Sequence, residues 1–296
     1  MPHVFLVSEW FLSNRASAIG FVYAGTGVDI LLLASLSEWL LSSWGWPLAF
    51  QSFFGIVLIL LLPLVWLFYQ HGPFGEKLRS KKESKADDQR WTAKLALRSL
   101  QFWLLFFARI CAASGTTVIV THQVAHVVDV GYSKLLAAGI FGLAGITSSF
   151  GRVVFGFIAD LLTKQAAYTL NILMTLVGVG ALMILRDPSQ TWLLYVYVIF
   201  FGIGFGSRAV IFSALTADIF SGKGFGSILG YSTVAVGVGG ALGSWLGGAF
   251  YDWTGSYLVS FALSTLVLAC SDVCIWLAGA PSVANRDKRL FGSPNL

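Results

Sequence analysis

The chain has 296 residues, of which 56% are hydrophobic and 11% charged, and it carries a formal net charge of +5. A soluble domain has about 25% charged residues and a polar exterior, which this composition cannot supply. The composition therefore excludes a soluble protein, and no basic and otherwise polar segment of the kind that binds nucleic acid is present.

Long apolar runs predict an all-α polytopic membrane protein in a lipid bilayer. A membrane-spanning helix needs about 20 mostly apolar residues, and eight runs meet this requirement after a shorter run at Val4–Phe11. Turn-forming residues such as Gly45-Trp46-Pro47 and Asp187-Pro188-Ser189 separate them. The predicted spans are Ala16–Leu40, Pro47–Tyr69, Ser99–Thr121, Leu135–Ile158, Ala166–Leu185, Trp192–Ala217, Phe225–Phe250 and Ser256–Gly279.

The distribution of basic residues predicts the orientation of these spans. Fifteen of the 19 Lys and Arg residues fall on one side of the predicted membrane and two on the other. Since loops rich in Lys and Arg stay in the cytoplasm, we expect this side and the C-terminus to be cytoplasmic. Met1–Phe11 is then expected to be the inner end of a helix whose beginning is missing.

One long polar stretch, Gln70–Arg98, divides the chain into residues 1–69, 70–98 and 99–296. We interpret it as a cytoplasmic linker between two helical bundles. An alternative is that its Lys81, Lys82 and Lys85 contact lipid headgroups, although acidic neighbours dilute this charge.

Several motifs give the chain a family resemblance. Gly151, Arg152, Gly156 and Asp160 form G-R-x-x-x-G-x-x-x-D, which resembles the cytoplasmic motif between helices eight and nine of the major facilitator superfamily (MFS). Other stretches resemble helices four to six and, in the monocarboxylate and oxalate/formate-type branch, helices ten to twelve. They include Trp10-Phe11, Asn14-Arg15-Ala16, Gly20, Gly25, Gly45-Trp46, Gly202, Gly204, Gly206, Ala217-Asp218, Gly224-Phe225-Gly226, Gly240-Ala241, Gly247-Gly248 and Tyr251–Tyr257.

The resemblance implies an incomplete MFS fold with eight full transmembrane helices, numbers 5–12 of the family pattern. Residues 1–69 would be the remnant of an N-terminal six-helix bundle, and residues 99–296 a complete C-terminal bundle with a cytoplasmic tail. Either the gene product is truncated or its true start lies upstream. The implied function is secondary transport of a small organic anion such as a monocarboxylate, with a proton, across a bacterial inner (plasma) membrane.

Two arginines in mid-span, Arg109 and Arg208, are the main candidates for binding the anion. A charge at the bilayer centre costs about 2.5–3.5 kcal/mol, so we expect both to face the protein interior or water. Each lies ~15 Å from the cytoplasmic end of its helix, and a guanidinium group suits a carboxylate. The alternative is that each pairs with a carboxylate or with helix carbonyls and only holds the bundle together.

Other polar residues follow the same helix faces. Thr116 and Gln123 share the face of Arg109, because the three recur at seven-residue intervals. Tyr197, Phe201, Gly204 and Phe212 share the face of Arg208, although aromatic residues at this spacing more commonly serve packing. Together these residues predict that each of the two helices has a water-accessible face.

Acidic and imidazole groups in the apolar runs are candidates for proton coupling. Asp29 is a protonatable group or counter-ion, and His122 and His126 at i, i+4 form a potential relay. Residues of this kind more commonly sit hydrated or hydrogen-bonded near the membrane interface. Asp272 lies in the last span, where we expect a neutral acid with a local hydrogen bond.

The Gly151–Asp160 motif and the eleventh family helix are expected to serve conformational change. By resemblance, Arg152 and Asp160 latch neighbouring helix ends at the cytoplasmic gate; the alternative for Arg152 is a purely topological role. Small residues four apart let helices approach closely. These are Gly239, Gly243 and Gly247 on one stripe, and Gly240, Ser244 and Gly248 on the next.

No motif indicates an enzyme, a metal or a cofactor. The sequence has no P-loop, so transport must use an existing gradient. Cys270 and Cys274 share a helix face but have no partner ligands nearby in the sequence. Two alternative functions remain: export of amphipathic or drug-like compounds, and a non-transporting membrane fragment.

Overall fold

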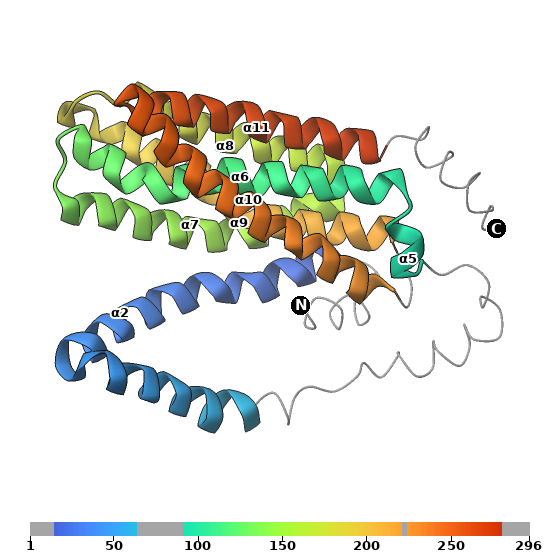
Figure 1. Ribbon diagram of the computed structural model, residues 1–296, viewed down its shortest axis with the longest axis horizontal. Coiled ribbons are helices and arrows are strands. Elements are labelled where there is room, and N and C mark those ends of the chain that lie inside the picture. Colours follow the sequence, from blue (N-terminus) through green and yellow to red (C-terminus); the bar gives the residue numbers. More distant parts are fainter. Residues whose placement is uncertain (1–14, 64–90, 221–223, 280–296) are drawn as a thin grey trace.

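The computed structural model describes residues 15–63, 91–220 and 224–279, without the side chains of residues 15, 25–35, 37–39, 41–42 and 60–61. These residues form helices and turns and contain no strand, so the predicted all-α class is confirmed (Figure 1). The helices are α2 (Arg15–Ile56) with a π-helical continuation (Val57–Leu61), α5 (Ala93–Ala96), α6 (Leu100–Asp129), α7 (Lys134–Leu161), α8 (Lys164–Ile184), a 3₁₀ turn (Pro188–Gln190), α9 (Thr191–Ile219), α10 (Phe225–Thr254) and α11 (Tyr257–Ala278).

Six helices of the described part, α6 to α11, are long and apolar enough to cross a membrane. They match the last six predicted spans, although α6 runs to Asp129 where the sequence analysis ends the span at Thr121. The first two predicted spans correspond to the two arms of α2, which bends at Gly45 (φ 73°, ψ 172°), two residues before Pro47. Residues 64–69 of the second span and the run Val4–Phe11 lie outside the described residues.

Local sequence signals set the helix ends. Ser99, Ser133 and Thr163 each accept a hydrogen bond from the backbone amide three residues later, and so cap the first turns of α6, α7 and α8. Ser256 caps α11 in a similar way. At the end of α10, Gly255 adopts φ 68°, a conformation that glycine reaches without steric cost.

The six long helices pack as two groups of three. In one group α9 packs between α7 and α8, and in the other α6 packs between α10 and α11. The groups meet mainly where α8 touches α11 and α6 touches α7, while the backbones of α6 and α9 are not closely packed. Helix α2 packs against α7 and touches α9, and Figure 1 shows its first arm diverging from the bundle and its second arm running back below the first. The fold therefore leaves an interface between α6 and α9 that only side chains bridge.

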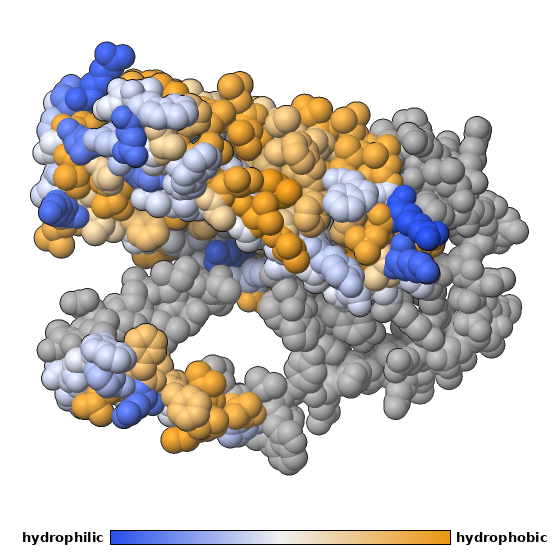
Figure 2. Space-filling view, viewed as in Figure 1, coloured by the Kyte–Doolittle hydropathy of each residue, from blue (hydrophilic) through white to orange (hydrophobic). Residues whose placement is uncertain are grey.

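The outer surface of the bundle is apolar, as a lipid environment requires. Figure 2 shows hydrophobic residues along the middle of the helices and hydrophilic ones near the ends. Large apolar side chains such as Leu135, Leu161 and Leu266 are mostly exposed. The buried core is instead rich in aromatic residues, among them Phe155, Tyr168 and Phe261.

Glycines form the close contacts within each group of three helices. A Cβ atom added at Gly151 would overlap the backbone of Ile203, and one at Gly206 would overlap the backbone of Ser148, so glycine seals the α7–α9 contact. Gly239 and Gly243 bring α10 equally close to α6. Small residues allow such approach in membranes, where packing rather than the hydrophobic effect drives helix association.

The α7–α9 contact yields a prediction about stability. Gly206→Ala should lower the stability of the folded protein by about 1–3 kcal/mol, because the neighbouring atoms at Ser148 belong to the backbone and cannot rotate away. Thermal unfolding of the detergent-solubilised chain measures the effect. Gly142→Ala on α7 is the control, since nothing lies within 4 Å of its added Cβ atom. Equal melting temperatures for the two variants would contradict the close α7–α9 contact at Gly206.

Candidate functional site

Polar and aromatic side chains of α6 and α9 meet in pairs across the space between the two helices. On α6 they are the predicted stripe of Arg109, Thr116 and Gln123, all buried. The Arg109 guanidinium carbon lies 4.7 Å from the ring centroid of Phe212. Thr116 accepts a hydrogen bond from Nη1 of Arg208, and Gln123 accepts one from the hydroxyl of Tyr197. The order of the pairs shows that α6 and α9 run antiparallel.

The site places the two arginines at different levels of this interface. Arg208 contacts Thr116, which lies seven residues or ~10 Å along α6 from Arg109. Arg109 in turn lies over Phe212, one turn of α9 beyond Arg208. The guanidinium groups share no hydrogen-bond partner among the described residues.

Arg208 donates hydrogen bonds to two helices besides its own. Its Nε donates to Oδ1 of Asn171 (3.3 Å) and its Nη2 to Oγ1 of Thr175 (2.9 Å), both on α8. Its Nη1 donates to Thr116 and to the backbone oxygen of Ala112 (3.4 Å), both on α6. The side chain therefore joins α6, α8 and α9 at one point.

The two threonine hydroxyls are oriented as acceptors for Arg208. Thr116 donates its own proton to the backbone oxygen of Ala112 (2.6 Å), and Thr175 donates to that of Asn171 (2.9 Å). Since each hydroxyl has one proton, only its lone pairs remain for the guanidinium group. Gly204 makes this arrangement possible, because a Cβ atom there would occupy the position of the Thr175 hydroxyl.

Arg109 has a different environment. Its Nη1 donates to the hydroxyl of Ser232 on α10 (2.8 Å), and its guanidinium carbon lies over the ring of Phe212. Among the described residues, the hydroxyl of Ser213 is the sole fully buried side-chain nitrogen or oxygen atom without a partner. The Nε and Nη2 of Arg109, which have no partner in that part of the chain, therefore keep some accessible surface.

Neither arginine forms an ion pair with a described carboxylate. In the part of the chain that the structure describes, ion pairs are formed by Lys164, with Asp160 and with Asp218. A buried charge without a counter-ion is costly even when hydrogen-bonded. Two such cations in one interface create a positive potential that favours an anion. The side chain of the predicted coupling residue Asp29 lies outside the described residues.

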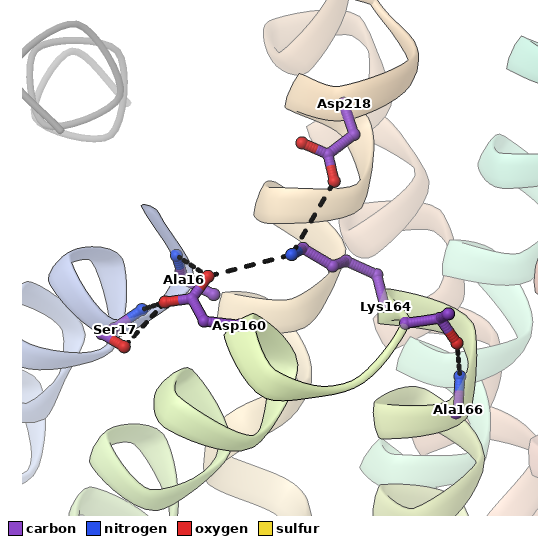
Figure 3. Close-up of polar contacts among 7 residues, drawn as sticks. Ala16, Ser17, Asp160, Lys164, Ala166 and Asp218 are labelled. Carbon is purple, nitrogen blue, oxygen red and sulfur yellow. Dashed lines mark hydrogen bonds and ion pairs between the residues drawn. The ribbon is translucent and has the colours of Figure 1, made fainter. Parts of the chain in front are cut away.

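The motif residue Asp160, at the end of α7, caps the first turn of α2 (Figure 3). Its carboxylate accepts hydrogen bonds from the backbone amides of Ala16 (3.2 Å) and Ser17 (2.8 Å) and from the Ser17 hydroxyl (2.7 Å). A negative charge at a helix N-terminus is also stabilised by the helix dipole. Lys164 bridges Asp160 (3.8 Å) to Asp218 at the end of α9 (4.0 Å).

The other motif residues support this contact between α2 and α7. Gly156 lies against Ala16 and Ser17, and Gly20 lies against the backbone oxygen of Arg152, so the helices cross at two glycines. The guanidinium group of Arg152, also buried, donates a long hydrogen bond to Ser149 (3.5 Å). Nearby, an apolar cluster joins α2 to α9 and α10; it consists of Ile19, Val210, Ala217, Phe225 and Leu229.

The two candidate relay histidines contact different helices. The Nε2 of His122 lies 3.2 Å from the backbone oxygen of Ser244 on α10, and that of His126 lies 2.9 Å from the backbone oxygen of Leu182 on α8. Because a carbonyl only accepts, both imidazoles carry a proton on Nε2. Tyr257 lies beside both rings. The two histidines therefore flank one tyrosine ring of α11 while they form hydrogen bonds to different helices.

Asp272 takes a local partner on the flank of the bundle. Its carboxyl group accepts from the hydroxyl of Thr169 on α8 (2.9 Å), which itself accepts from the indole of Trp276 (2.8 Å). This arrangement agrees with the expected local hydrogen bond. Among the described residues, no group of three or more His, Cys, Asp or Glu side chains is placed to hold a metal ion.

Three partners that distinguish the two arginines were not predicted from the sequence: Asn171, Thr175 and Ser232. All three are buried. A buried polar side chain needs a hydrogen-bond partner. A polar residue within an apolar run of the sequence is therefore a signal that could have identified these three positions. Which arginine each one serves depends on helix packing.

Comparisons with known proteins extend these observations. The model of the Major Facilitator Superfamily matches residues 3–207 and, in a second match, residues 168–294. Monocarboxylate transporter 13 of Rattus norvegicus is 30% identical over 93% of this chain and 63% of its own length. Monocarboxylate transporter 2 of Rattus norvegicus is 27% identical (94% and 60%), and the oxalate:formate antiporter of Oxalobacter formigenes is 25% identical (93% and 65%).

The chain spans less than two thirds of the length of these relatives. Their names are those of transporters and not of enzymes, in agreement with the sequence analysis. Since the family match covers most of the chain and includes the Gly151–Asp160 motif, the predicted resemblance is confirmed: this chain belongs to the Major Facilitator Superfamily.

Proposed function

We propose that the chain takes part in secondary active transport of a small organic anion, such as a monocarboxylate, by alternating access. The observation that carries the proposal is the pair of buried cations, Arg109 and Arg208, which have no carboxylate partner among the described residues. A bound carboxylate would neutralise the positive potential between α6 and α9. The names of the relatives, which transport monocarboxylates or exchange oxalate and formate, support this substrate class.

The same geometry favours an anion over an amphipathic drug-like compound. Aromatic side chains are present, but Tyr197 is hydrogen-bonded to Gln123 and fully buried, and Phe201 is also fully buried. These rings therefore pack in the bundle and do not line an open aromatic cavity. The accessible atoms of Arg109 are guanidinium nitrogens, which are polar and positively charged.

We further propose that the end of the bundle at Asp160 faces the cytoplasm of a plasma membrane and forms its gate. The fastening of α2 to α7 by Asp160, the glycine crossing and the apolar cluster would hold this end closed. Transport would then require these contacts to separate while the glycine-sealed groups of helices move as units.

Uptake of a radiolabelled monocarboxylate into proteoliposomes tests the function. The wild-type chain should accumulate formate or lactate. Arg109→Gln should lower the rate by at least about tenfold, since a buried charge-assisted contact contributes about 1.5–3 kcal/mol. Arg208→Gln should also lower the rate, because it removes one of the two positive charges and the hydrogen bonds that join α6, α8 and α9. Arg186→Gln is the control, because Arg186 lies in an exposed loop.

The control variant should transport like the wild type. Unaltered uptake by both buried-arginine variants would contradict the anion site. A folded wild-type chain that takes up no carboxylate would instead support the non-transporting alternative.

Proton coupling is tested by comparing gradient-driven uptake with exchange at equal pH. An inward proton gradient should accelerate wild-type uptake, and Asp29→Asn should abolish this acceleration but keep exchange, because asparagine resembles the protonated acid. If His122 and His126 relay the proton, His122→Gln and His126→Gln should slow gradient-driven uptake more than exchange. Normal gradient dependence in all three variants would exclude them as coupling groups.

The gate predicts an effect of Asp160 on the first turn of α2. Asp160→Ala should increase hydrogen exchange at the amides of Ala16 and Ser17, because both lose their acceptor. Mass spectrometry of exchanged peptides measures the change. Asp187→Ala is the control: Asp187 also caps a helical turn, at a separate exposed loop, where hydrogen bonds from Ser189 lower its pKa. Protection at Ala16 and Ser17 that survives Asp160→Ala would contradict the latch.

A further inference from the structure

We propose that the two buried arginines have different roles: Arg109 contacts the anion, whereas Arg208 is a positioning residue that holds α6, α8 and α9 together without contacting it. This proposal rests on the proposed function for the identity of the ligand. It assigns a positioning role to Arg208, Asn171 and Thr175, and a ligand-orienting role to Ser232.

The hydrogen bonds of Arg208 are nearly saturated by the protein. A guanidinium group has five N–H donors, and Arg208 uses four of them, on Asn171, Thr175, Thr116 and the backbone of Ala112. A carboxylate that bound Arg208 in the usual two-pronged way would have to displace at least one of these acceptors. Each displaced hydroxyl would remain buried between helices without its partner, which opposes binding.

The donors of Arg109 remain available. Among the described residues it uses one donor, on Ser232, while its guanidinium carbon lies over the ring of Phe212. The hydroxyl of Ser232 donates to the backbone of Leu229 (2.8 Å), so it accepts from Arg109 and helps to orient the guanidinium group. A carboxylate can therefore bind the remaining N–H donors without displacing a hydrogen-bond acceptor of the protein.

The position of Arg109 also suits a ligand site. Arg109 is carried by α6 and contacts Phe212 of α9 and Ser232 of α10, so a ligand bound to it would lie where these three helices meet. Arg208 is instead surrounded by its acceptors on α6 and α8.

Arg208 affects Arg109 through α6. The backbones of α6 and α9 are not closely packed, so the hydrogen bond from Arg208 to Thr116 helps to fix the helix that carries Arg109. The bond to Thr175 fixes α8, which carries none of the proposed ligand groups. We call the hydrogen bonds by which Arg208 joins α6, α8 and α9 the clamp. Removal of either threonine hydroxyl should weaken the clamp, but only removal of the Thr116 hydroxyl should also disturb Arg109.

The experiment measures two quantities on the purified full chain: the melting temperature without ligand, and the dissociation constant for formate and lactate by titration. Arg109→Gln should bind at least about tenfold more weakly with little change in melting temperature, and Arg109→Lys should recover part of the affinity. Arg208→Lys should lower the melting temperature by several degrees, because one ammonium group cannot bridge three helices. Saturating carboxylate should still stabilise Arg208→Lys but not Arg109→Gln.

A matched pair of variants distinguishes positioning from a general structural role. Thr116→Val and Thr175→Val should both lower the melting temperature, and the dissociation constant should rise about threefold or more for Thr116→Val alone. The proposal is overturned if Arg109→Gln binds like the wild type, or if Arg208→Lys and Thr175→Val weaken binding at unchanged melting temperature. If the wild type binds no carboxylate, the proposed function fails, and the order of the ligand-free melting temperatures still decides whether Arg208 is the clamp.

Discussion

The arrangement of the bundle depends on how it accommodates the Arg208 guanidinium group in an apolar interior. Each neighbouring helix supplies neutral oxygens to this cation: hydroxyls that are turned toward it by bonds to their own backbone, an amide, and a carbonyl. This network satisfies the hydrogen-bonding requirement of the group but leaves its charge uncompensated. Structure and electrostatics are therefore linked, since the contacts that hold α6 near α9 also maintain a positive potential there.

The positive potential lies at an interface that is packed differently from the rest of the bundle. Within each group of three helices, glycines bring backbones together so closely that a single methyl group would overlap the backbone of a neighbouring helix. Between α6 and α9, by contrast, long side chains bridge the gap in pairs. Tightly sealed groups separated by a polar, side-chain-bridged interface suit a protein whose halves shift around a ligand.

Much of this fold follows from the sequence alone. Long apolar runs predict α7 to α11 within four residues at each end, because the length of an apolar run is a local property. The later end of α6 at Asp129 was missed because the helix continues beyond the apolar run into polar and His-containing sequence. Helical periodicity also predicts that Arg109, Thr116 and Gln123 share a face.

The candidate site was harder to predict, because partners across helices depend on packing. Equal depth along separate helices suggests that Arg109 and Arg208 bind one anion together, but depth does not predict their protein partners, which lie on α6 and α8 for Arg208 and on α10 for Arg109. Periodicity likewise places His122 and His126 on neighbouring positions without showing that they contact different helices. The motif spacing predicts a latch at Asp160, whereas its partner, the first turn of α2, required the three-dimensional structure.

The cap that Asp160 places on α2 has a physical consequence for how the protein senses its surroundings. Its carboxylate and Lys164 are only partly buried, so dissolved ions reach the attraction between this charge and the helix start. Attractions of this kind weaken as the electrolyte concentration rises, whereas the glycine crossing beside it does not depend on salt. Ionic strength therefore adjusts how firmly Asp160 holds the start of α2.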